Sequence, residues 1–351
     1  MWPSFLGRFT KQLGIDMGSA NTRVFLKDKG VVLNESSVVA INRRTGQVMA
    51  VGEQARMMLG KTPPHMHVSR PVQRGIIADF EVAEKLLRYV FHQVHEDGSL
   101  VIPRPQVVMS VPLDVTEVER KAASDAAMSA GARSVLLVEE PIAAAIGAGL
   151  PISEAKGNMV VNIGGGSTEI AIISLNGIVT AKTIQIAGDE LNKNIAQYAR
   201  DVFNLLLGER VAEEVKMAIG TAVEWDEPLQ GSMRGRDLVT GLPKEILVND
   251  AQIREALGRS IKAMVEQVKG ILEITPPELV ADIHRNGIML TGGGALLKGM
   301  DVVLSRGTGL PVHVAESPEL AVVRGTGMLL DNATLLKDVG FPATDSTSLM
   351  K

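Results

Sequence analysis

The chain has 351 residues, of which 45% are hydrophobic and 3% aromatic, and it contains no cysteine. This size and composition predict a globular protein with one large or two medium domains, and they exclude wholesale disorder, disulfides and thiolate chemistry. The 36 basic and 40 acidic residues give a net charge of −4, which argues against a nucleic-acid partner.

The start of the chain carries an amphipathic pattern. It lacks the apolar block and cleavage site of a signal peptide, and no apolar run approaches the about 20 residues that span a bilayer, so we expect a cytoplasmic chain. Apolar side chains recur at helical spacing around the basic Arg8 and Lys11: Trp2, Phe5, Leu6, Phe9 and Leu13. Residues 1–12 are therefore predicted to bind a membrane interface; the alternative is a leader that packs this stripe on the protein's own surface.

From Leu13 onward the pattern alternates strands and helices. Residues 14–26 are predicted to form a strand, a Gly-rich turn and a second strand, with a third strand at 31–41. A helix with one apolar face follows over about residues 80–95. The apolar tip Leu100-Val101 is either a second membrane-inserting patch or the start of the next strand.

The alternation continues to the end of the chain, and it predicts an α/β protein with mixed sheets. Thr116 and Glu119 have the spacing of a capping box, which marks the start of a helix. The expected elements are a strand at 106–112, a helix from Thr116 to Gly131, a strand at 134–138, a helix at 139–150, a strand–turn–strand at 159–175, helices at about 189–207, 209–219 and 251–273, and a strand–turn–helix at 287–300.

One hairpin occurs twice in the sequence. Residues 15–24 align with residues 161–170 so that Gly18 falls on Gly164, about 146 positions later. Two copies of one hairpin suggest two lobes of the same fold facing a shared cleft. A single Gly-rich turn of this kind fits an ordinary hairpin equally well, so the argument rests on the matched pair.

The chemistry of these turns suits phosphate groups. Glycine lets the backbone bend and approach closely, so a Gly-, Ser- and Thr-rich turn can aim N–H groups at a phosphate. An acidic residue at the strand end would hold Mg²⁺, mainly through water, and Asp16 fits that role. The run Gly292-Gly293-Gly294 after a buried strand is a third approach point, suited to adenine or the α-phosphate.

Four segments carry a family resemblance: GIDMGSANTRVFL, VEEPIAAAIGAGL, VVNIGGGSTEIAIISL and IMLTGGGALLKGM. In order and spacing they resemble the phosphate-1, connect-1, phosphate-2 and adenosine motifs of the actin–sugar-kinase–DnaK superfamily. Together with VVLNESSVVAI they resemble the MreB family of bacterial actins in particular, over residues 1–336. The resemblance implies an actin-like α/β fold, with two lobes of duplicated ribonuclease-H-like topology in four subdomains around a nucleotide cleft.

The resemblance also implies a division of the chain. The expected parts are a membrane-binding segment 1–12, lobe I at 13–145 plus about 315–336 with a small subdomain at about 33–75, lobe II at 146–314 with a small subdomain at about 181–250, and a disordered tail 337–351.

Site residues follow from the resemblance position by position. ATP or GTP would bind with Mg²⁺, and Glu140 would position the attacking water with Ser167 beside it as the second catalytic candidate. On the residues alone, Glu140 is equally a first-turn carboxylate that complements a helix dipole. The expected nucleotide-binding residues are Gly18, Ser19, Ala20, Asn21 and Thr22 at the β-phosphate, Gly164, Gly165, Gly166, Ser167 and Thr168 at the γ-phosphate, Asp189, Glu213 and Lys216 near ribose and adenine, and Gly292, Gly293 and Gly294. By periodicity alone, Glu213 and Lys216 are surface charges of a helix at 209–219.

One position departs from the family pattern at the chemistry itself. The phosphate-2 motif normally begins with aspartate, and here that position is Asn162. An uncharged amide weakens the hold on Mg²⁺ and its water shell, so we expect a chain that binds ATP and hydrolyses it slowly or not at all. Smaller departures are Met17, Ser19, Ala187 and Asn192, where Leu, Thr, Gly and Asp are expected.

The function implied by the resemblance is cytoskeletal. Membrane-associated filaments, with double protofilaments of the chain itself, would organise wall synthesis and rod shape from the inner face of the cell membrane, together with the cell-wall elongation machinery. The alternatives are a nucleotide-binding filament without meaningful ATPase activity, or another ATPase or kinase of the superfamily. A sugar kinase would need a substrate-binding insertion and a DnaK-type chaperone a β-rich peptide domain, and the sequence shows a segment for neither.

Overall fold

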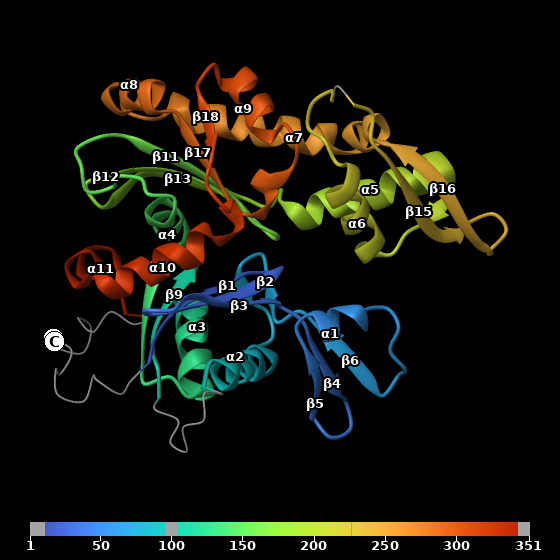
Figure 1. Cartoon of the computed structure of the whole chain (residues 1–351), viewed down its shortest axis with the longest axis horizontal. Coiled ribbons are helices and arrows are strands. Elements are labelled where there is room, and N and C mark those ends of the chain that lie inside the picture. The colour runs from blue at the N-terminus through green and yellow to red at the C-terminus, as the bar shows by residue number, and fades with distance from the viewer. Residues whose placement is uncertain (1–10, 96–103, 226, 343–351) are drawn as a thin grey trace. The chain divides into compact units, whose positions relative to one another are not determined.

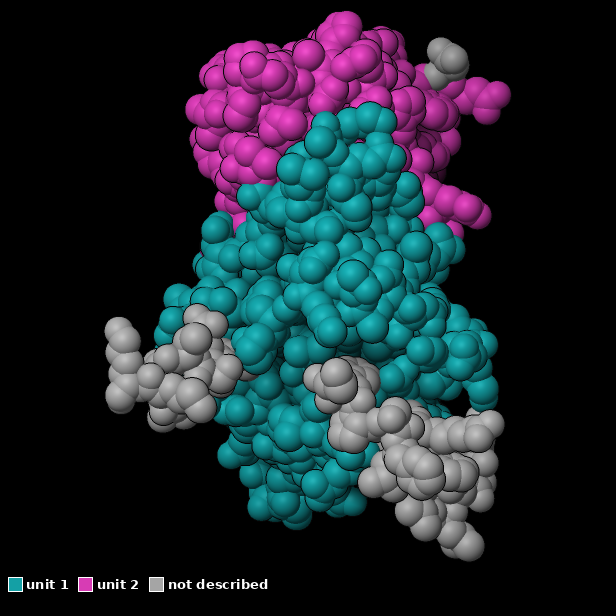
Figure 2. All heavy atoms as spheres, turned by 90° about the vertical axis from the view of Figure 1, so that its left-hand side faces the viewer, with its two compact units in different colours: residues 1–156, 173–178, 320–351 teal, residues 157–172, 179–319 magenta. Residues whose placement is uncertain are grey.

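The computed structural model of the chain describes residues 11–95, 104–225 and 227–342. The chain divides into two compact units, which are coloured separately in Figure 2. Unit 1 comprises Met1–Lys156, Ile173–Ile178 and Leu320–Lys351, and unit 2 comprises Gly157–Ile172 and Val179–Glu319. The predicted boundary between lobe I and lobe II, after residue 145, lies about ten residues before the observed one after Lys156. The predicted return to lobe I, after residue 314, lies about five residues before the observed one after Glu319.

Unit 1 is built on a five-stranded mixed sheet with the order β10-β9-β1-β2-β3 (Figure 1). Its strands are β1 (Gln12–Met17), β2 (Asn21–Leu26), β3 (Gly30–Ser36), β9 (Gln106–Val111) and β10 (Ser134–Glu139). β2 pairs antiparallel with β1 and β3, whereas β9 pairs parallel with β1 and β10. Every residue of β9 is buried, as expected for a central strand of a sheet covered on both faces.

Helices cover both faces of this sheet. α2 (Phe80–His95) and α3 (Glu117–Ala130) lie on one face, and α4 (Glu140–Gly147) and α10 (Ala321–Asp331) on the other (Figure 1). The predicted helix bounds of α2 and α3 are confirmed. The capping box is confirmed as well, because Thr116 Oγ1 accepts from Glu119 N while the Glu119 carboxylate accepts from Thr116 N, and Gly131 ends the helix in the left-handed region.

The predicted single strand over residues 31–41 is wrong. It is divided at Ser37-Val38 into β3 and β4, which belong to different sheets. The chain turns there because Ser37 N donates to Ala20 O and Val38 N donates back to Ser36 O. The small part of unit 1 that follows contains β4 (Val39–Asn42), β5 (Val48–Val51), α1 (Glu53–Met57), β6 (Met66–Ser69), β7 (Val72–Gln73) and β8 (Ile76–Ile77).

Unit 2 is built on a second five-stranded sheet with the order β13-β12-β11-β17-β18. β17 pairs parallel with both β11 and β18. The strands are β11 (Asn158–Ile163), β12 (Thr168–Ser174), β13 (Gly177–Ile184), β17 (Ile288–Thr291) and β18 (Val312–Val314). A separate small sheet contains β14 (Leu205–Leu206), β15 (Gln230–Asp237) and β16 (Pro243–Asn249).

The helices of unit 2 pack their apolar faces into one core with the main sheet. They are α5 (Gly188–Phe203), α6 (Glu209–Ile219), α7 (Asp250–Glu273), α8 (Pro277–Asn286) and α9 (Met300–Thr308), with short 3-10 turns η2 (Gly293–Leu296) and η3 (Pro318–Leu320). α5 ends about four residues before its predicted end. The left-handed Asn204, with φ of 51°, stops the helix so that Leu205 and Leu206 can pair with β15.

The two ends of the described chain correct two predictions. α11 (Ala333–Val339) is a helix and Phe341 pairs with Leu137, so the segment from 337 to 342 is folded where a disordered tail was expected. Leu13 is fully buried in β1 and therefore takes no part in the predicted membrane stripe. The other residues of that stripe, Trp2, Phe5, Leu6 and Phe9, and the tip Leu100-Val101 lie outside the described residues. Within the described residues no helix has the length and apolar character needed to cross a bilayer.

Candidate functional site

The first Gly-rich turn joins β1 to β2. Gly18 N donates to Asn21 O at 3.0 Å, and a Cβ on Gly18 would lie 3.1 Å from the same oxygen, which favours glycine. The carbonyl oxygens of the turn are engaged, because Ser37 Oγ donates to Gly18 O and Ser37 N to Ala20 O. Among the described residues, the N–H groups of Ser19 and Ala20 have no acceptor.

The second turn joins β11 to β12 and closes with the same backbone hydrogen bond as the first. Gly164 N donates to Ser167 O at 2.9 Å, and a Cβ on Gly164 would lie 3.0 Å from that oxygen. Its carbonyl oxygens are engaged as well, by Gly188 N on Gly164 O and by Asp189 N on Gly165 O. The N–H groups of Gly165 and Gly166 have no acceptor in the part of the chain that the structure describes.

The matching hydrogen bonds confirm the duplication that the sequence alignment predicts. In each turn several carbonyl groups accept hydrogen bonds from backbone or hydroxyl donors, and two successive N–H groups have no acceptor among the described residues. Such a row of backbone N–H groups is an anion-binding arrangement. The threonine that follows each turn fixes the hairpin to the next segment, since Thr22 Oγ1 contacts Ser37 Oγ and Thr168 Oγ1 donates to Ile186 O.

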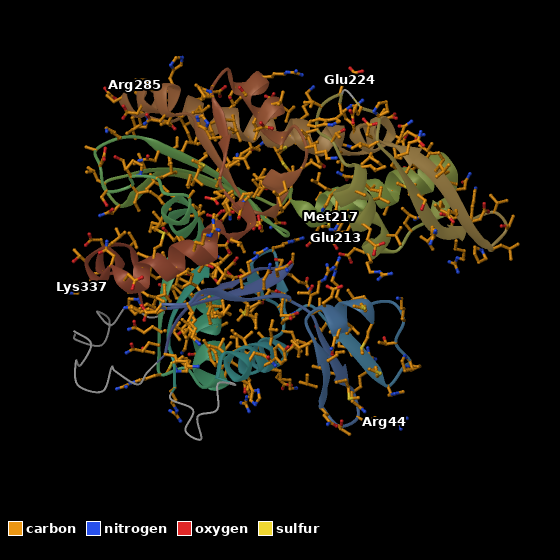
Figure 3. The ribbon with its side chains drawn as sticks, in the orientation of Figure 1. Arg44, Glu213, Met217, Glu224, Arg285 and Lys337 are labelled. Carbon is orange, nitrogen blue, oxygen red and sulfur yellow. The ribbon has the colours of Figure 1, made fainter. Side chains whose placement is uncertain are left out.

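The start of α5 and the middle of α6 lie beside the second turn. Lys216 Nζ donates to Gly188 O at 2.9 Å, and Gly188 N is bonded to the turn, so the structure brings Lys216 and Asp189 to the hairpin. Burial lowers the pKa of Lys216, and the carboxylates of Glu213, Asp189 and Glu209 oppose that shift. Lys216 is therefore more than a solvated surface charge. Glu213, labelled in Figure 3, lies on the same helix and is half-buried.

Ala187, which stands where the family pattern has glycine, causes no backbone strain. Its φ of −155° and ψ of −164° are extended values that any residue adopts, so glycine is not required there. Asn192, the other departure in this segment, is buried on α5, and its Oδ1 has no hydrogen-bond partner among the described residues.

The third Gly-rich turn packs directly on β11. Gly292 has φ of +81°, and a Cβ there would overlap Ile163 O and lie 2.8 Å from Asn162 Oδ1, so glycine is required. A Cβ on Gly294 would overlap the Ile163 side chain, whereas nothing lies within 4 Å of a Cβ on Gly293. Unit 2 thus brings this turn, the second hairpin and Asn162 together.

Asn162 is buried at the end of β11 beside β17. Its exposed fraction is 3%, and Thr291 Oγ1 donates to Asn162 Oδ1 at 3.2 Å across the parallel pair. The carbonyl oxygen that stands where the family has a carboxylate is therefore already engaged by a hydroxyl group.

Asp16, the matching residue of unit 1, is buried and paired with a cation. Arg23 Nη1 lies 3.1 Å from Asp16 Oδ2, and the two residues are direct partners in the antiparallel register of β1 and β2. Burial raises the pKa of Asp16, and the charge and hydrogen bond of Arg23 oppose this shift. Arg23 was not among the predicted site residues. The sequence feature that could have revealed it is a basic residue in β2 that pairs with the predicted metal-binding aspartate in the hairpin register.

The side-chain oxygen atoms of Asp16 and Asn162 are poorly suited to hold Mg²⁺. Mg²⁺ prefers oxygen ligands in octahedral geometry, keeps several waters and is usually held by one or two carboxylates of the protein. The two positions predicted to anchor it supply a carboxylate that is already paired with an arginine and a neutral amide that already accepts a hydrogen bond from a hydroxyl group. No group of three His, Cys, Asp or Glu side chains suited to a metal is found among the described residues.

The catalytic candidates come from different units. Glu140 is half-buried at the first turn of α4 in unit 1, and Ser167 is buried in the second hairpin of unit 2. Glu139, which precedes α4, has a pKa raised by burial, and the charge of Arg120 partly offsets this rise.

The two units, each with a five-stranded mixed sheet and the same Gly-rich hairpin, define an actin-like protein. The crystal structure of MreB5 of Spiroplasma citri bound to ADP matches this fold with a TM-score of 0.88 at 35% identity, covering 94% of this chain and 98% of that one.

The chain belongs to the MreB/Mbl protein family, whose sequence model matches residues 10–338. The cell shape-determining protein MreB of Escherichia coli (strain K12) is 48% identical over 335 residues, which are 94% of this chain and 96% of that protein. The cell shape-determining protein Mbl of Bacillus subtilis (strain 168) is 46% identical over 324 residues, which are 92% of this chain and 97% of that protein.

Proposed function

We propose that this chain is an ATP-binding cytoskeletal protein that assembles into filaments on the inner face of the cell membrane and organises cell-wall synthesis and rod shape. The observation that carries the proposal is the pair of matched turns, each with engaged carbonyl groups and free N–H groups. The relatives that determine cell shape and the relative solved with ADP support the same reading.

In this proposal each hairpin binds one phosphate group of the nucleotide. Residues 18–22 supply N–H groups to the β-phosphate and residues 164–168 to the γ-phosphate. Lys216, Glu213 and Asp189 serve the ribose and adenine, and the turn 292–294 gives the adenosine a close backbone approach. ATP is preferred to GTP because MreB5 of Spiroplasma citri was also solved with AMPPNP, an adenine nucleotide analogue.

Hydrolysis is slow in this proposal. Glu140 orients the attacking water and Ser167 lies at the γ-phosphate, but Asn162 brings no charge to that end of the nucleotide. A filament that binds nucleotide without meaningful turnover is the second candidate function, and the engaged amide of Asn162 is the observation that favours it. Membership of the MreB/Mbl family favours a filament over a sugar kinase or a chaperone.

Filament formation is expected to depend on ATP and on Lys216. We expect the chain to pellet with ATP and to show filaments by negative-stain electron microscopy. Lys216→Met removes the half-buried cation beside the second hairpin. It is expected to raise the ATP concentration for half-maximal pelleting about tenfold, since a hydrogen bond to a charged group contributes about 1.5–3 kcal/mol.

The matched control is Lys193→Met on the exposed face of α5, whose lysine pairs with Glu190 at 3.5 Å. It is expected to pellet like the original chain. Equal ATP dependence of all three proteins would contradict the role of Lys216. Absence of filaments under every nucleotide condition would contradict the proposed function itself.

Binding to lipid is proposed for residues 1–10, where the stripe Trp2, Phe5, Leu6 and Phe9 remains after the loss of Leu13. Deleting residues 1–10 is expected to abolish co-sedimentation with anionic liposomes. The deletion stops before Lys11, because Lys11 Nζ donates to Val94 O at 2.6 Å and belongs to the folded unit. One short amphipathic segment binds weakly, so the filament supplies avidity by presenting many copies.

A pair of single substitutions makes this test specific. Trp2→Ala is expected to lower the lipid-bound fraction several-fold, since an aromatic side chain transferred from water contributes about 1.5–3 kcal/mol. Trp225→Ala removes the other tryptophan, which is 42% exposed in unit 2, and is expected to leave binding unchanged. Undiminished binding after the deletion would leave Leu100 and Val101 as the candidate lipid contacts.

The proposed location is the cytoplasmic face of the membrane, where the chain binds peripherally. Its proposed partners are further copies of itself in paired protofilaments and the machinery that elongates the cell wall. Nucleic acid is not among them.

A further inference from the structure

Three polar residues stand in a row across the first hairpin and its neighbour. In the registers of β1, β2 and β3 (Figure 1), Arg23 is the direct partner of Asp16 on one side and of Asn34 on the other. The Arg23 and Asp16 side chains are only 15% and 8% exposed, and their charged atoms are 3.1 Å apart. The ion pair is therefore largely buried within the sheet, whereas several ion pairs on the helices are exposed to solvent.

The row lies at the phosphate-binding turn. A Cβ on Gly18 would be 3.6 Å from Asp16 Oδ1, so the carboxylate lies against the turn itself. Because side chains alternate along a strand, Arg23 shares its face of β2 with Asn21, the last residue of the turn. Asn21 Nδ2 donates to Asn34 Oδ1 at 3.1 Å and completes the polar surface on this face.

The guanidinium of Arg23 has one N–H group that is not used in a hydrogen bond with the described residues. Its Nε is buried and has no hydrogen-bond partner in the described part of the chain. A buried N–H without an acceptor costs free energy, about 1–3 kcal/mol, unless a ligand supplies the acceptor. A guanidinium presents several N–H groups in a planar fork, which matches phosphate oxygens.

The charges at both hairpins also favour phosphate binding without a metal ion. An unpaired Asp16 would repel the phosphates of ATP and would require a cation between them. Arg23 already supplies that cation, and the second hairpin carries no carboxylate at Asn162. Of the two positions at which this family type would anchor Mg²⁺, one is therefore a carboxylate neutralised by Arg23 and the other is an uncharged amide.

We propose that Arg23 is a built-in counter-cation for nucleotide phosphates at the first hairpin, so that this chain binds ATP with little dependence on Mg²⁺. This inference rests on the proposed nucleotide binding and specifies its metal requirement. Arg23 neutralises Asp16 and, together with the free N–H groups of Ser19 and Ala20, forms the phosphate contact.

The test is a binding titration of the full chain with a fluorescent ATP analogue, in Mg²⁺ and in EDTA. The quantity of interest is the ratio of the dissociation constant in EDTA to that in Mg²⁺. For the original chain we expect a ratio below about three. For Arg23→Gln we expect binding in EDTA to weaken about tenfold or more and the ratio to exceed about ten, because the freed carboxylate then requires a metal.

Two further variants make the result specific. Arg56→Gln breaks another 3.1 Å arginine–carboxylate pair of unit 1, with Glu53, and is expected to keep the low ratio. Asp16→Asn leaves Arg23 in place and is also expected to keep the low ratio, whereas a chain that holds Mg²⁺ through Asp16 would lose its binding of the Mg²⁺ complex. Asp16→Asn carries the test if Arg23→Gln does not fold, as judged by circular dichroism.

The possible outcomes distinguish a failure of the proposed role of Arg23 from a failure of the proposed nucleotide binding. A ratio above about ten for the original chain, or an unchanged ratio in Arg23→Gln, would overturn the role of Arg23 while leaving nucleotide binding intact. Absence of binding by the original chain in both Mg²⁺ and EDTA would overturn the proposed function, and this inference with it.

Discussion

Replacing Asn162 by aspartate is expected to accelerate phosphate release from ATP by about tenfold to a hundredfold. Asn162 is buried at the end of β11, immediately before the second hairpin, and brings a neutral amide where the family pattern has a negative charge. An aspartate fits the same space and can still accept a hydrogen bond from Thr291 Oγ1, so the change introduces the charge without requiring new packing. The measurement is single-turnover phosphate release from ATP by preassembled protein.

Asn158→Asp is the matched control, because it makes the same amide-to-carboxylate change on the same buried strand, four residues earlier. It is expected to leave the release rate within about twofold, since charge acts on the reaction only where the reacting phosphate lies. Rapid release by the original chain, at a rate that Asn162→Asp does not change, would contradict the idea that the amide limits hydrolysis.

Replacing Gly325 by alanine is expected to destabilise the protein by about 2–4 kcal/mol. Gly325 lies on α10 where this helix crosses α4, and a Cβ there would overlap the carbonyl oxygen of Ala143. Gly147 on α4 is equally close to the carbonyl oxygen of Ala321. Backbone atoms of two helices cannot move aside as a side-chain end can, so the helices must separate and lose their buried contact.

Gly258→Ala provides the control for this prediction. Gly258 lies within α7, and nothing lies within 4 Å of a Cβ built on it. The same substitution should there stabilise the helix by about 0.5–1 kcal/mol, because alanine has the lower conformational entropy in the unfolded chain. Chemical denaturation followed by circular dichroism measures both changes. A similar shift for the two variants would show that the helix crossing tolerates a methyl group.

Local patterns carried most of the prediction of the fold. The apolar face of α2, the capping box of α3 and the repeated hairpin were all readable, because each depends on residues close in sequence. The second hairpin could be aligned with the first since Gly18 and Gly164 face the same steric demand from the carbonyl three residues later.

The errors arose where distant residues decide the conformation. Residues 31–41 have the alternation of one strand, yet Ala20 and Ser37 form a hydrogen bond that divides it. The polar tail after Lys337 gave no sign that Phe341 pairs with Leu137 in β10. Arg23 was missed for the same reason, because its partner Asp16 became visible only once the register of β1 and β2 was known.

The interleaving of the two units has a consequence for synthesis on the ribosome. All of unit 2 has been translated once residue 319 is added, whereas unit 1 still lacks α10. Until that helix emerges, β1 keeps an uncovered apolar face and α4 has no partner at Gly147. The order of completion is therefore inverted, because the unit whose sheet is translated first is the last to receive its covering helix. A nascent chain halted before residue 320 presents this face to chaperones or to aggregation.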